Sequence, residues 1–500
     1  MHGIINGRIV LNDKILDGCA LLFDQKIIGI VSRETVDRAW QTNKSWQGKP
    51  LTLTDAGGAY VSPGFINLHI HGCAGADTMD AEEDTLAAMS RFLVQTGVTA
   101  FLPTTMTCGK DDVYKALERI REGMTRITRR RDERREPGPA EQKQANETAQ
   151  IPVNETVQIP ADEATNLSDK TSAGISVTIR PEPAATKDGE RCNRLPGAKV
   201  LGAYLEGPFI SSQYKGAQQE TFIKPADFAF IKGFDDVVRV VVLAPETLGK
   251  KLKQETDDGT ATPVQAQGAT DRVLADDLKS ETQDPDGQVS LKSFIGQCKM
   301  HHMIVSLGHS ASDYDTAQLA FVEGASHVTH LCNAMTGMHH RNPGLLGAAL
   351  DSSAMCEVIA DDLHVHPAVQ RLIYRTKGAA GIELITDSMR ACGLPDGVSE
   401  LGGQAVYVKD GAARLADGTI AGSVVTLNRA MANFRRNTGA TVSEVVRMVT
   451  ENQAQELGLF EKIGSLSPGA VADVTVFNED FTVLYTFVDG CEVYKNPAFR

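Results

Sequence analysis

The sequence predicts an α/β protein: a (β/α)8 barrel of the TIM type with a small β-sandwich domain formed from both chain ends. Two observations carry this prediction. Eight apolar runs of strand length recur through the middle of the chain, and stretches with helical spacing, such as residues 81–97 and 312–324, lie between many of them. Short strand-like runs separated by Gly, Asp and Asn turns occur at both ends. An open, doubly wound sheet is the alternative fold, because its sequence would show the same alternation of strands and helices.

The order of these elements gives a division of the chain into three parts. The predicted barrel strands are residues 59–70, 98–104, 198–205, 238–243, 303–308, 326–332, 356–361 and 382–387. Residues 1–58 read as short strands, and a similar texture returns at 405–422 and 472–496. We therefore expect the first part of the sandwich at 1–58, the barrel at 59–392, and the rest of the sandwich with C-terminal helices at 393–500.

Two segments interrupt the strand and helix rhythm, at about residues 131–196 and 249–289. The first is rich in Glu, Thr, Pro, Gln and Asn, and the second has a similar composition. Neither segment can bury much apolar surface, so we expect mobile insertions between barrel elements.

Composition narrows the classes of function. The chain has 500 residues, a net charge of −14, 42% hydrophobic and 23% charged residues, as is ordinary for a globular enzyme. Nucleic-acid binding needs a basic face, which this balance does not favour, although a small anionic substrate needs only a few local donors. The first residues lack a signal-peptide pattern, and no run of 18 apolar residues occurs. We therefore expect a cytoplasmic protein with no membrane partner.

Side chains suited to metal binding stand at the ends of most predicted barrel strands. In a barrel these carboxyl ends meet at one face, where barrel enzymes carry their chemistry. The residues so placed are His69, His71, Glu206, His309, His330, His364 and Asp387. His69 and His71 are two apart, so on a strand they share one face.

This set of side chains predicts a metal-dependent hydrolase. Imidazole nitrogens and a carboxylate are the ligands expected for Zn²⁺ or a similar divalent ion. Such an ion can polarise a carbonyl and lower the pKa of water to roughly 7. A carboxylate that takes the proton from this water and passes it to a leaving amine completes the reaction, and Asp387 is the candidate.

A family resemblance rests on nine motifs in order: PGFINLHIHG, YLEGPF, KGAQ, GHSAS, THLCNAM, RNPG, ADDLHV, ITDS and AGS. In this order they resemble the N-acetylglucosamine-6-phosphate deacetylases of the amidohydrolase superfamily. The resemblance covers essentially the whole chain apart from the two insertions. The two histidines of LHIHG alone would indicate only the superfamily.

The resemblance implies a set of metal ligands. Glu206, His309 and His330 would hold the main ion, with the glutamate standing where many superfamily members have a carboxylated lysine. His69 and His71 match the pair that holds a second ion in members with this motif. The implied cofactor is a divalent ion, with Zn²⁺ expected, at one or two ions per subunit.

The resemblance also implies roles for residues that touch the substrate. Asp387 matches the general acid and base, and His364 matches the residue that contacts the sugar and helps to stabilise the oxyanion. Gln218 stands in KGAQ where some members have histidine. Glutamine can hydrogen-bond a sugar hydroxyl but cannot titrate, so Gln218 is expected to be a substrate contact at most.

The resemblance also implies a binding site for the phosphate group of the substrate, in the stretch THLCNAMTGMHHRNPG. The backbone amides of Asn333 and Ala334 and the guanidinium of Arg341 resemble the family's phosphate grip, and a planar guanidinium suits phosphate because it donates two parallel hydrogen bonds. In the family this arginine reaches the neighbouring subunit's site. The resemblance therefore implies a homodimer.

The implied reaction is hydrolysis of the acetamide of N-acetylglucosamine 6-phosphate to glucosamine 6-phosphate and acetate. Two alternatives stay open. One is another amidohydrolase, acting on a cyclic amide or an unphosphorylated acetyl-sugar, against which Arg341 argues. The other is a non-catalytic sugar-phosphate-binding regulator whose insertions recruit partners, which predicts an eroded metal site.

Overall fold

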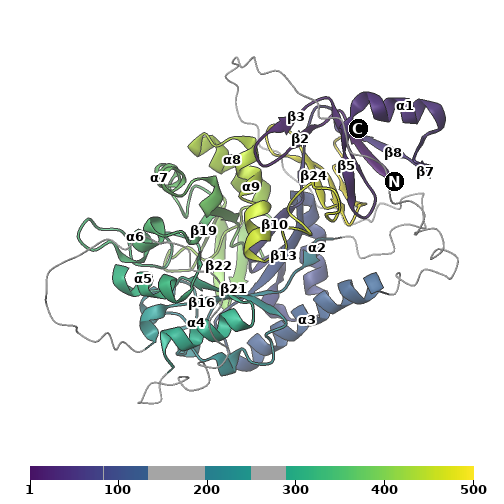
Figure 1. Ribbon diagram of the computed structural model, residues 1–500. Helices are drawn as coiled ribbons and strands as arrows, with labels where there is room; N and C mark the ends of the chain where they lie inside the picture. The colour runs from purple at the N-terminus through teal and green to yellow at the C-terminus, as the bar shows by residue number, and fades with distance from the viewer. Residues whose placement is uncertain (83, 133–196, 249–288, 500) are drawn as a thin grey trace. The chain divides into compact units, whose positions relative to one another are not determined.

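The computed structural model describes residues 1–82, 84–132, 197–248 and 289–499 (Figure 1). The two predicted insertions lie almost entirely outside these residues, so their predicted mobility concerns a part of the chain that is not described. None of the described helices combines the length and apolar composition of a membrane span.

Eight parallel strands follow one another in chain order around a barrel (Figure 1). They are β10 (Phe65–Ile70), β13 (Val98–Thr105), β15 (Ala203–Leu205), β16 (Val238–Leu243), β17 (Ile304–Leu307), β18 (His327–Val328), β19 (Met355–Ile359) and β20 (Ile382–Ile385); β14 (Lys199–Val200) also pairs with β13. The first and last strands meet, because the amide of Asp387 donates to the carbonyl of His69 at 2.9 Å. The predicted barrel is confirmed, and the open sheet is wrong.

Helices cover the outside of the strands. They are α2 (Thr85–Leu93), α3 (Lys110–Asp132), α4 (Leu291–Met300), α5 (Tyr314–Glu323), α6 (Gly344–Asp351), α7 (Pro367–Lys377), α8 (Leu427–Thr438), α9 (Val442–Arg447) and α10 (Glu451–Glu456). The sequence sets their ends: α5 begins where the side chain of Asp313 accepts from the amide of Thr316, and it ends at Gly324, whose φ is 114°. Phe294 and Leu345 are fully buried where the helices pack on the strands.

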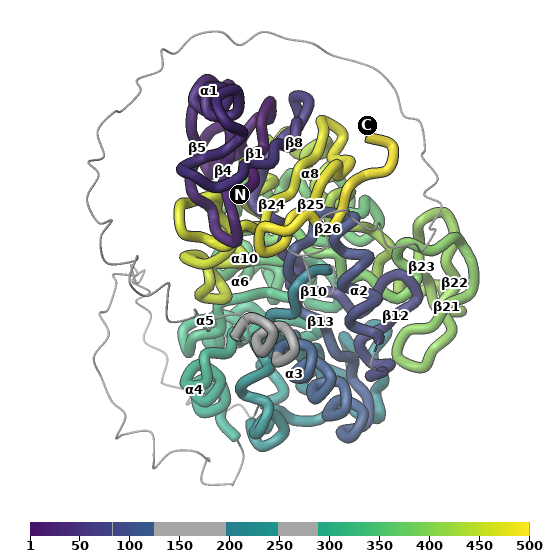
Figure 2. The backbone as a smooth tube through the Cα atoms, turned by 90° about the vertical axis from the view of Figure 1, so that its right-hand side faces the viewer, coloured from purple at the N-terminus to yellow at the C-terminus, as the bar shows by residue number. Residues whose placement is uncertain are grey.

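Two further sheets contain the strands of both chain ends. One contains β1 (His2–Ile5), β4 (Cys19–Phe23), β5 (Ile27–Ser32) and β8 (Thr52–Asp55). The other contains β2 (Arg8–Val10), β3 (Ile15–Leu16), β9 (Tyr60–Pro63), β24 (Val474–Phe477), β25 (Val483–Val488) and β26 (Cys491–Lys495). Phe23, Val474 and Phe487 share one buried cluster between them. Both ends of the chain thus supply strands that lie side by side (Figure 2). Smaller elements are α1 (Arg33–Asn43), β6 (Ser45–Trp46), β7 (Lys49–Pro50), β11 (Gly72–Cys73) and β12 (Ala76–Asp77).

Residues 397–414 differ from their sequence assignment to the sandwich. They form a separate sheet of β21 (Gly397–Leu401), β22 (Gln404–Lys409) and β23 (Ala412–Arg414). Leu401 and Val406 of this sheet pack with Met106 and Met389, which follow barrel strands. Alternation in sequence identifies a strand but not the sheet it joins, because that choice depends on contacts with distant residues.

Lys199 in β14 joins the barrel to the strands at the chain ends. Its ammonium group pairs with Asp473 and lies 3.6 Å from Asp489, and all three side chains are buried or nearly so. We expect Lys199→Met to lower the free energy of unfolding by about 3 kcal/mol, because it removes the cation that pairs with the buried carboxylate of Asp473. Urea unfolding measures this loss.

A matched control uses an exposed pair. Lys49 lies 3.7 Å from Asp24, and both side chains are more than half exposed. Lys49→Met should cost at most about 1 kcal/mol, because water screens such pairs. Equal losses in the two variants would contradict the role given to Lys199.

Candidate active site

Side chains suited to metal binding, from the ends of four strands, meet at the carboxyl end of the barrel. Two overlapping groups have ligand atoms within 4.8 Å of one another: the first is Glu206, His309 and His330, and the second is His69, His71 and Glu206. We call these five residues the ligand cluster. All five are buried, and Glu206 belongs to both groups. The parallel strands bring together side chains that are up to 261 positions apart in sequence, from His69 to His330.

The first group closes around one oxygen of Glu206. Its Oε1 lies 3.1 Å from His309 Nε2 and 3.0 Å from His330 Nε2, and these two nitrogens are 3.0 Å apart. His309 Nδ1 donates to the carbonyl of Tyr214 at 2.8 Å, which leaves its Nε2 as an acceptor. A single cation among these three atoms could be coordinated by all of them. Tetrahedral ligands about 2.0–2.2 Å from Zn²⁺ are separated by roughly 3.3–3.6 Å, so the donor set fits a divalent ion.

The second group lies around the other side of Glu206. His71 Nε2 is 3.1 Å from Glu206 Oε2 and 3.2 Å from Asp387 Oδ1. His69 Nε2 is 3.5 Å from an oxygen of each of the same two carboxylates. This nitrogen makes no hydrogen bond among the described residues, although His69 is completely buried. An unsatisfied nitrogen facing two carboxylates fits a second cation position.

The electrostatics of the site favour positive charge at the histidines. Burial acts to lower the pKa of His71, but hydrogen bonds with Asp387 and Glu206 outweigh it and raise that pKa to about 10. Burial acts to raise the pKa of Asp387, but the charge on His69 and the hydrogen bond with His71 lower it to about 2. A divalent ion can take the place of these protons, because metal binding displaces them.

Three residues of the site have left-handed backbone conformations. The φ angles of His309, His330 and Asp387 are 46°, 27° and 46°. Such conformations cost of order 1–3 kcal/mol for residues other than glycine and persist where the surroundings hold them. Here each one follows the end of a barrel strand, so the turn directs a functional side chain into the barrel mouth.

The sequence matches known proteins along most of its length. The profile of the amidohydrolase family matches residues 265–493. N-acetylglucosamine-6-phosphate deacetylase from Bacillus subtilis (strain 168) is 32% identical over 433 residues, which cover 86% of this chain and 83% of the relative. The chain belongs to the N-acetylglucosamine-6-phosphate deacetylase family. It is therefore a metal-dependent amidohydrolase.

A second relative and a crystal structure are also similar to this chain. N-acetylgalactosamine-6-phosphate deacetylase from Escherichia coli O157:H7 is 30% identical over 447 residues, covering 88% of this chain and 89% of the relative. The crystal structure of N-acetylglucosamine-6-phosphate deacetylase from Pasteurella multocida superposes with a TM-score of 0.71 at 25% identity, covering 99% and 100% of the two chains.

The family resemblance linked His364 and Gln218 to the substrate, and the two side chains have different hydrogen-bond partners. His364 follows β19, where its Nδ1 is 2.6 Å from Asp361 Oδ2. Gln218 is buried; its Nε2 donates to Glu206 Oε2 at 2.7 Å, and its Oε1 accepts from the amide of Thr107 at 2.7 Å. Gln218 thus supports a member of the ligand cluster, and its contact with substrate stays a prediction.

The residues expected to bind phosphate lie in the segment after His330. The amide of Asn333 donates to the carbonyl of His330 at 3.0 Å, and the carbonyl of Ala334 accepts from the amide of Ser310 at 3.1 Å. Arg341 is exposed, and its Nη1 lies 2.6 Å from His340 Nε2. Asn333 is thus bonded to His330 of the ligand cluster, and Ala334 is bonded to Ser310, which follows His309. Among the described residues, Arg341 makes no hydrogen bond or ion pair with the cluster.

Sequence reasoning missed Glu357, in the middle of β19. This residue is completely buried, and its Oε2 lies 2.9 Å from His69 Nδ1. The available signal was a carboxylate inside a predicted buried strand, which requires a partner because burial of a lone charge is costly.

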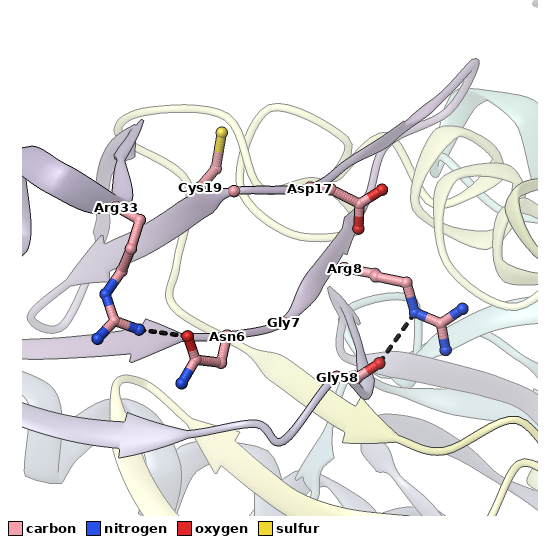
Figure 3. A pocket seen from close by; sticks show the side chains of 8 residues that line it. Asn6, Gly7, Arg8, Asp17, Cys19, Arg33 and Gly58 are labelled. Atoms are coloured by element: carbon pink, nitrogen blue, oxygen red, sulfur yellow. Dashed lines mark hydrogen bonds between the residues drawn. The ribbon is translucent and has the colours of Figure 1, made fainter. Parts of the chain in front are cut away.

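A separate pocket of about 320 Å³ lies among the N-terminal strands, lined by Asn6, Arg8, Asp17, Cys19, Arg33 and Gly58 (Figure 3). Its arginines are engaged: Arg33 donates to the side chain of Asn6, and Arg8 donates to the carbonyl of Gly58. The pocket includes none of the predicted site residues, so it is distinct from the ligand cluster.

Proposed function

We propose that this chain hydrolyses the acetamide of N-acetyl-D-glucosamine 6-phosphate, giving D-glucosamine 6-phosphate and acetate, in amino-sugar catabolism or recycling. The observation that carries the proposal is the position of Asp387 Oδ1, 3.2 Å from His71 Nε2 and 3.5 Å from His69 Nε2. A carboxylate beside a buried set of metal ligands has the chemistry that amide hydrolysis requires.

Five residues are assigned to metal binding. Glu206, His309 and His330 would hold the main divalent ion, proposed to be Zn²⁺, and His69 and His71 a second one. When bound, such an ion polarises the acetyl carbonyl and lowers the pKa of water to roughly 7.

Proton transfer falls to Asp387. It takes a proton from the attacking water and then gives it to the amine nitrogen as the C–N bond breaks. His364 contacts the sugar and helps to stabilise the developing oxyanion, and the contact with Asp361 holds its ring in place.

We assign phosphate binding to the backbone around Asn333 and Ala334 and to Arg341 of a neighbouring subunit in a homodimer. Support comes from the exposure of Arg341 and from its guanidinium, which contacts a histidine ring rather than a carboxylate. Its charge is therefore available to an anion. We also propose a cytoplasmic location, because a charged sugar phosphate does not cross a bilayer unaided.

The deciding experiment measures acetate release from four sugars, with metal content determined on the same sample. The sugars are N-acetylglucosamine and N-acetylgalactosamine, each with and without the 6-phosphate. We expect turnover of N-acetylglucosamine 6-phosphate and little of the unphosphorylated sugars. The galactosamine substrate is included because the relative from E. coli carries that name. Equal turnover without phosphate would favour another amidohydrolase, and absence of both metal and turnover would favour a regulator.

Arg341→Met should raise KM for the phosphorylated sugar roughly 10- to 100-fold and change kcat little, because a hydrogen bond to a charged group contributes about 1.5–3 kcal/mol. Steady-state kinetics measure both constants. Arg375→Met, which removes an exposed arginine on α7, is the control and should leave KM unchanged.

Mixed dimers test whether Arg341 acts across subunits. Arg341→Met and Asp387→Asn are co-expressed with different tags, and the heterodimer is purified. If the arginine acts across the interface, one intact site forms and activity at low substrate returns. A heterodimer with no more activity at low substrate than either homodimeric variant would contradict this assignment.

A further inference from the structure

Glu357 and Glu383 are two carboxylates inside the barrel. They are direct partners in the register between β19 and β20, and both are completely buried. Removing a carboxylate from water costs several kcal/mol unless hydrogen bonds and a counter-charge compensate. Each one faces a buried histidine, but only one of these histidines belongs to the ligand cluster.

Glu357 connects two strands of the ligand cluster through a single oxygen. Its Oε2 lies 2.9 Å from His69 Nδ1, and it accepts from the backbone amide of His330 at 2.9 Å. His69 lies in β10 and His330 follows β18, so this oxygen links a ligand of the second group to a ligand of the first. The ring of His69 also stacks on Tyr204, with centroids 4.4 Å apart.

The contact determines which nitrogen of His69 is available to a metal ion. A carboxylate oxygen only accepts hydrogen bonds, so Nδ1 carries the proton. The lone pair is then on Nε2, the nitrogen that lies 3.5 Å from Glu206 Oε1 and 3.5 Å from Asp387 Oδ1. With the opposite tautomer, Nε2–H would point into the cluster and block coordination. Carboxylate partners of this kind commonly orient metal-binding histidines.

We propose that Glu357 is a positioning residue that fixes the tautomer and orientation of His69 and holds the turn of His330, so that both halves of the metal site keep their arrangement. This inference rests on the proposed metal-dependent function. Glu357 is not a member of the ligand cluster and acts through its contacts with His69 and the amide of His330.

Glu383 provides a matched control. Its Oε2 lies 3.0 Å from His327 Nε2, and His327 Nδ1 is 3.0 Å from Ser306 Oγ. His327 is buried like His69 but belongs to neither group of the ligand cluster. Substitutions at Glu357 and Glu383 therefore remove the same chemical group from the same interior, and only the first should affect metal binding specifically.

The experiment compares the Leu and Gln variants at both positions by Zn²⁺ titration of the chelator-treated full chain, with thermal melting in parallel. We expect Glu357→Leu to weaken Zn²⁺ binding roughly 10- to 100-fold, as is typical when such a partner is lost. Glu357→Gln keeps an oxygen that can accept both hydrogen bonds, so it should restore most of the affinity. Glu383→Leu should lower the melting temperature without changing the Zn²⁺ affinity of the folded chain.

The readouts separate this inference from the proposed reaction. Wild-type Zn²⁺ affinity in Glu357→Leu, or an equal loss in Glu383→Leu, would overturn the role of Glu357. Zn²⁺ affinity is measured without any sugar. A chain that releases no acetate yet shows the expected order of affinities would therefore refute the proposed substrate and support the positioning role.

Discussion

Asp387→Asn is expected to bind metal as the wild type does but to lose turnover by roughly 10²- to 10⁴-fold, the usual contribution of a general acid and base. Asparagine keeps the shape of the side chain but cannot carry the proton from water to the leaving amine. The backbone of this residue is held independently: its amide donates to the carbonyl of His69 at 2.9 Å, and its carbonyl accepts from Ser423 at 2.8 Å. The substitution should therefore leave the local structure intact.

Measurements of kcat and of bound metal on the same preparation distinguish proton transfer from metal loss. Asp235→Asn is a suitable control, because Asp235 is a partly exposed carboxylate whose side chain pairs with His301. Wild-type turnover in Asp387→Asn would refute the role given to Asp387. Loss of metal together with turnover would instead make Asp387 a necessary ligand.

The barrel was predictable because buried parallel strands read as continuous apolar runs. The run at 238–243 coincides with β16, and the run at 98–104 differs from β13 by one residue. The run at 59–70 was wrongly read as one barrel strand, because Tyr60–Pro63 form β9 of a sheet at the chain ends and β10 begins at Phe65. The run at 326–332 was too long, because β18 covers only His327–Val328. The chain turns there to place His330 in the ligand cluster, and local hydrophobicity does not encode that turn.

The five residues of the ligand cluster could be predicted to lie close together, because the carboxyl ends of parallel barrel strands share one face. Individual partners could not be inferred in this way. Gln218, in a loop, bonds to Glu206, and Glu357 in β19 bonds to His69 in β10. The first contact depends on the path of the loop and the second on the relative heights of two strands distant in sequence. The separate sheet of β21, β22 and β23 escaped prediction for the same reason: its buried side chains meet Met106 and Met389.

Glu206→Gln should release metal from both halves of the site, because Glu206 is the one residue that the two groups share. The variant keeps the shape of the side chain but loses its charge, and its amide nitrogen would replace an oxygen beside a histidine nitrogen. Removing one charge from a buried pair costs about 3–5 kcal/mol, which corresponds to roughly 100- to 5,000-fold weaker metal binding. Metal analysis after gel filtration measures this loss.

Glu246→Gln is the control for loss of a neighbouring carboxylate. Glu246 accepts from Ser310 Oγ at 2.7 Å, beside His309, but lies outside the ligand cluster. Its substitution should leave metal content unchanged. Excess Zn²⁺ then separates the two large effects, because added metal should recover part of the activity of Glu206→Gln but none of the activity of Asp387→Asn. Full metal content in Glu206→Gln would show that the ion is held elsewhere and that the shared carboxylate is not its ligand.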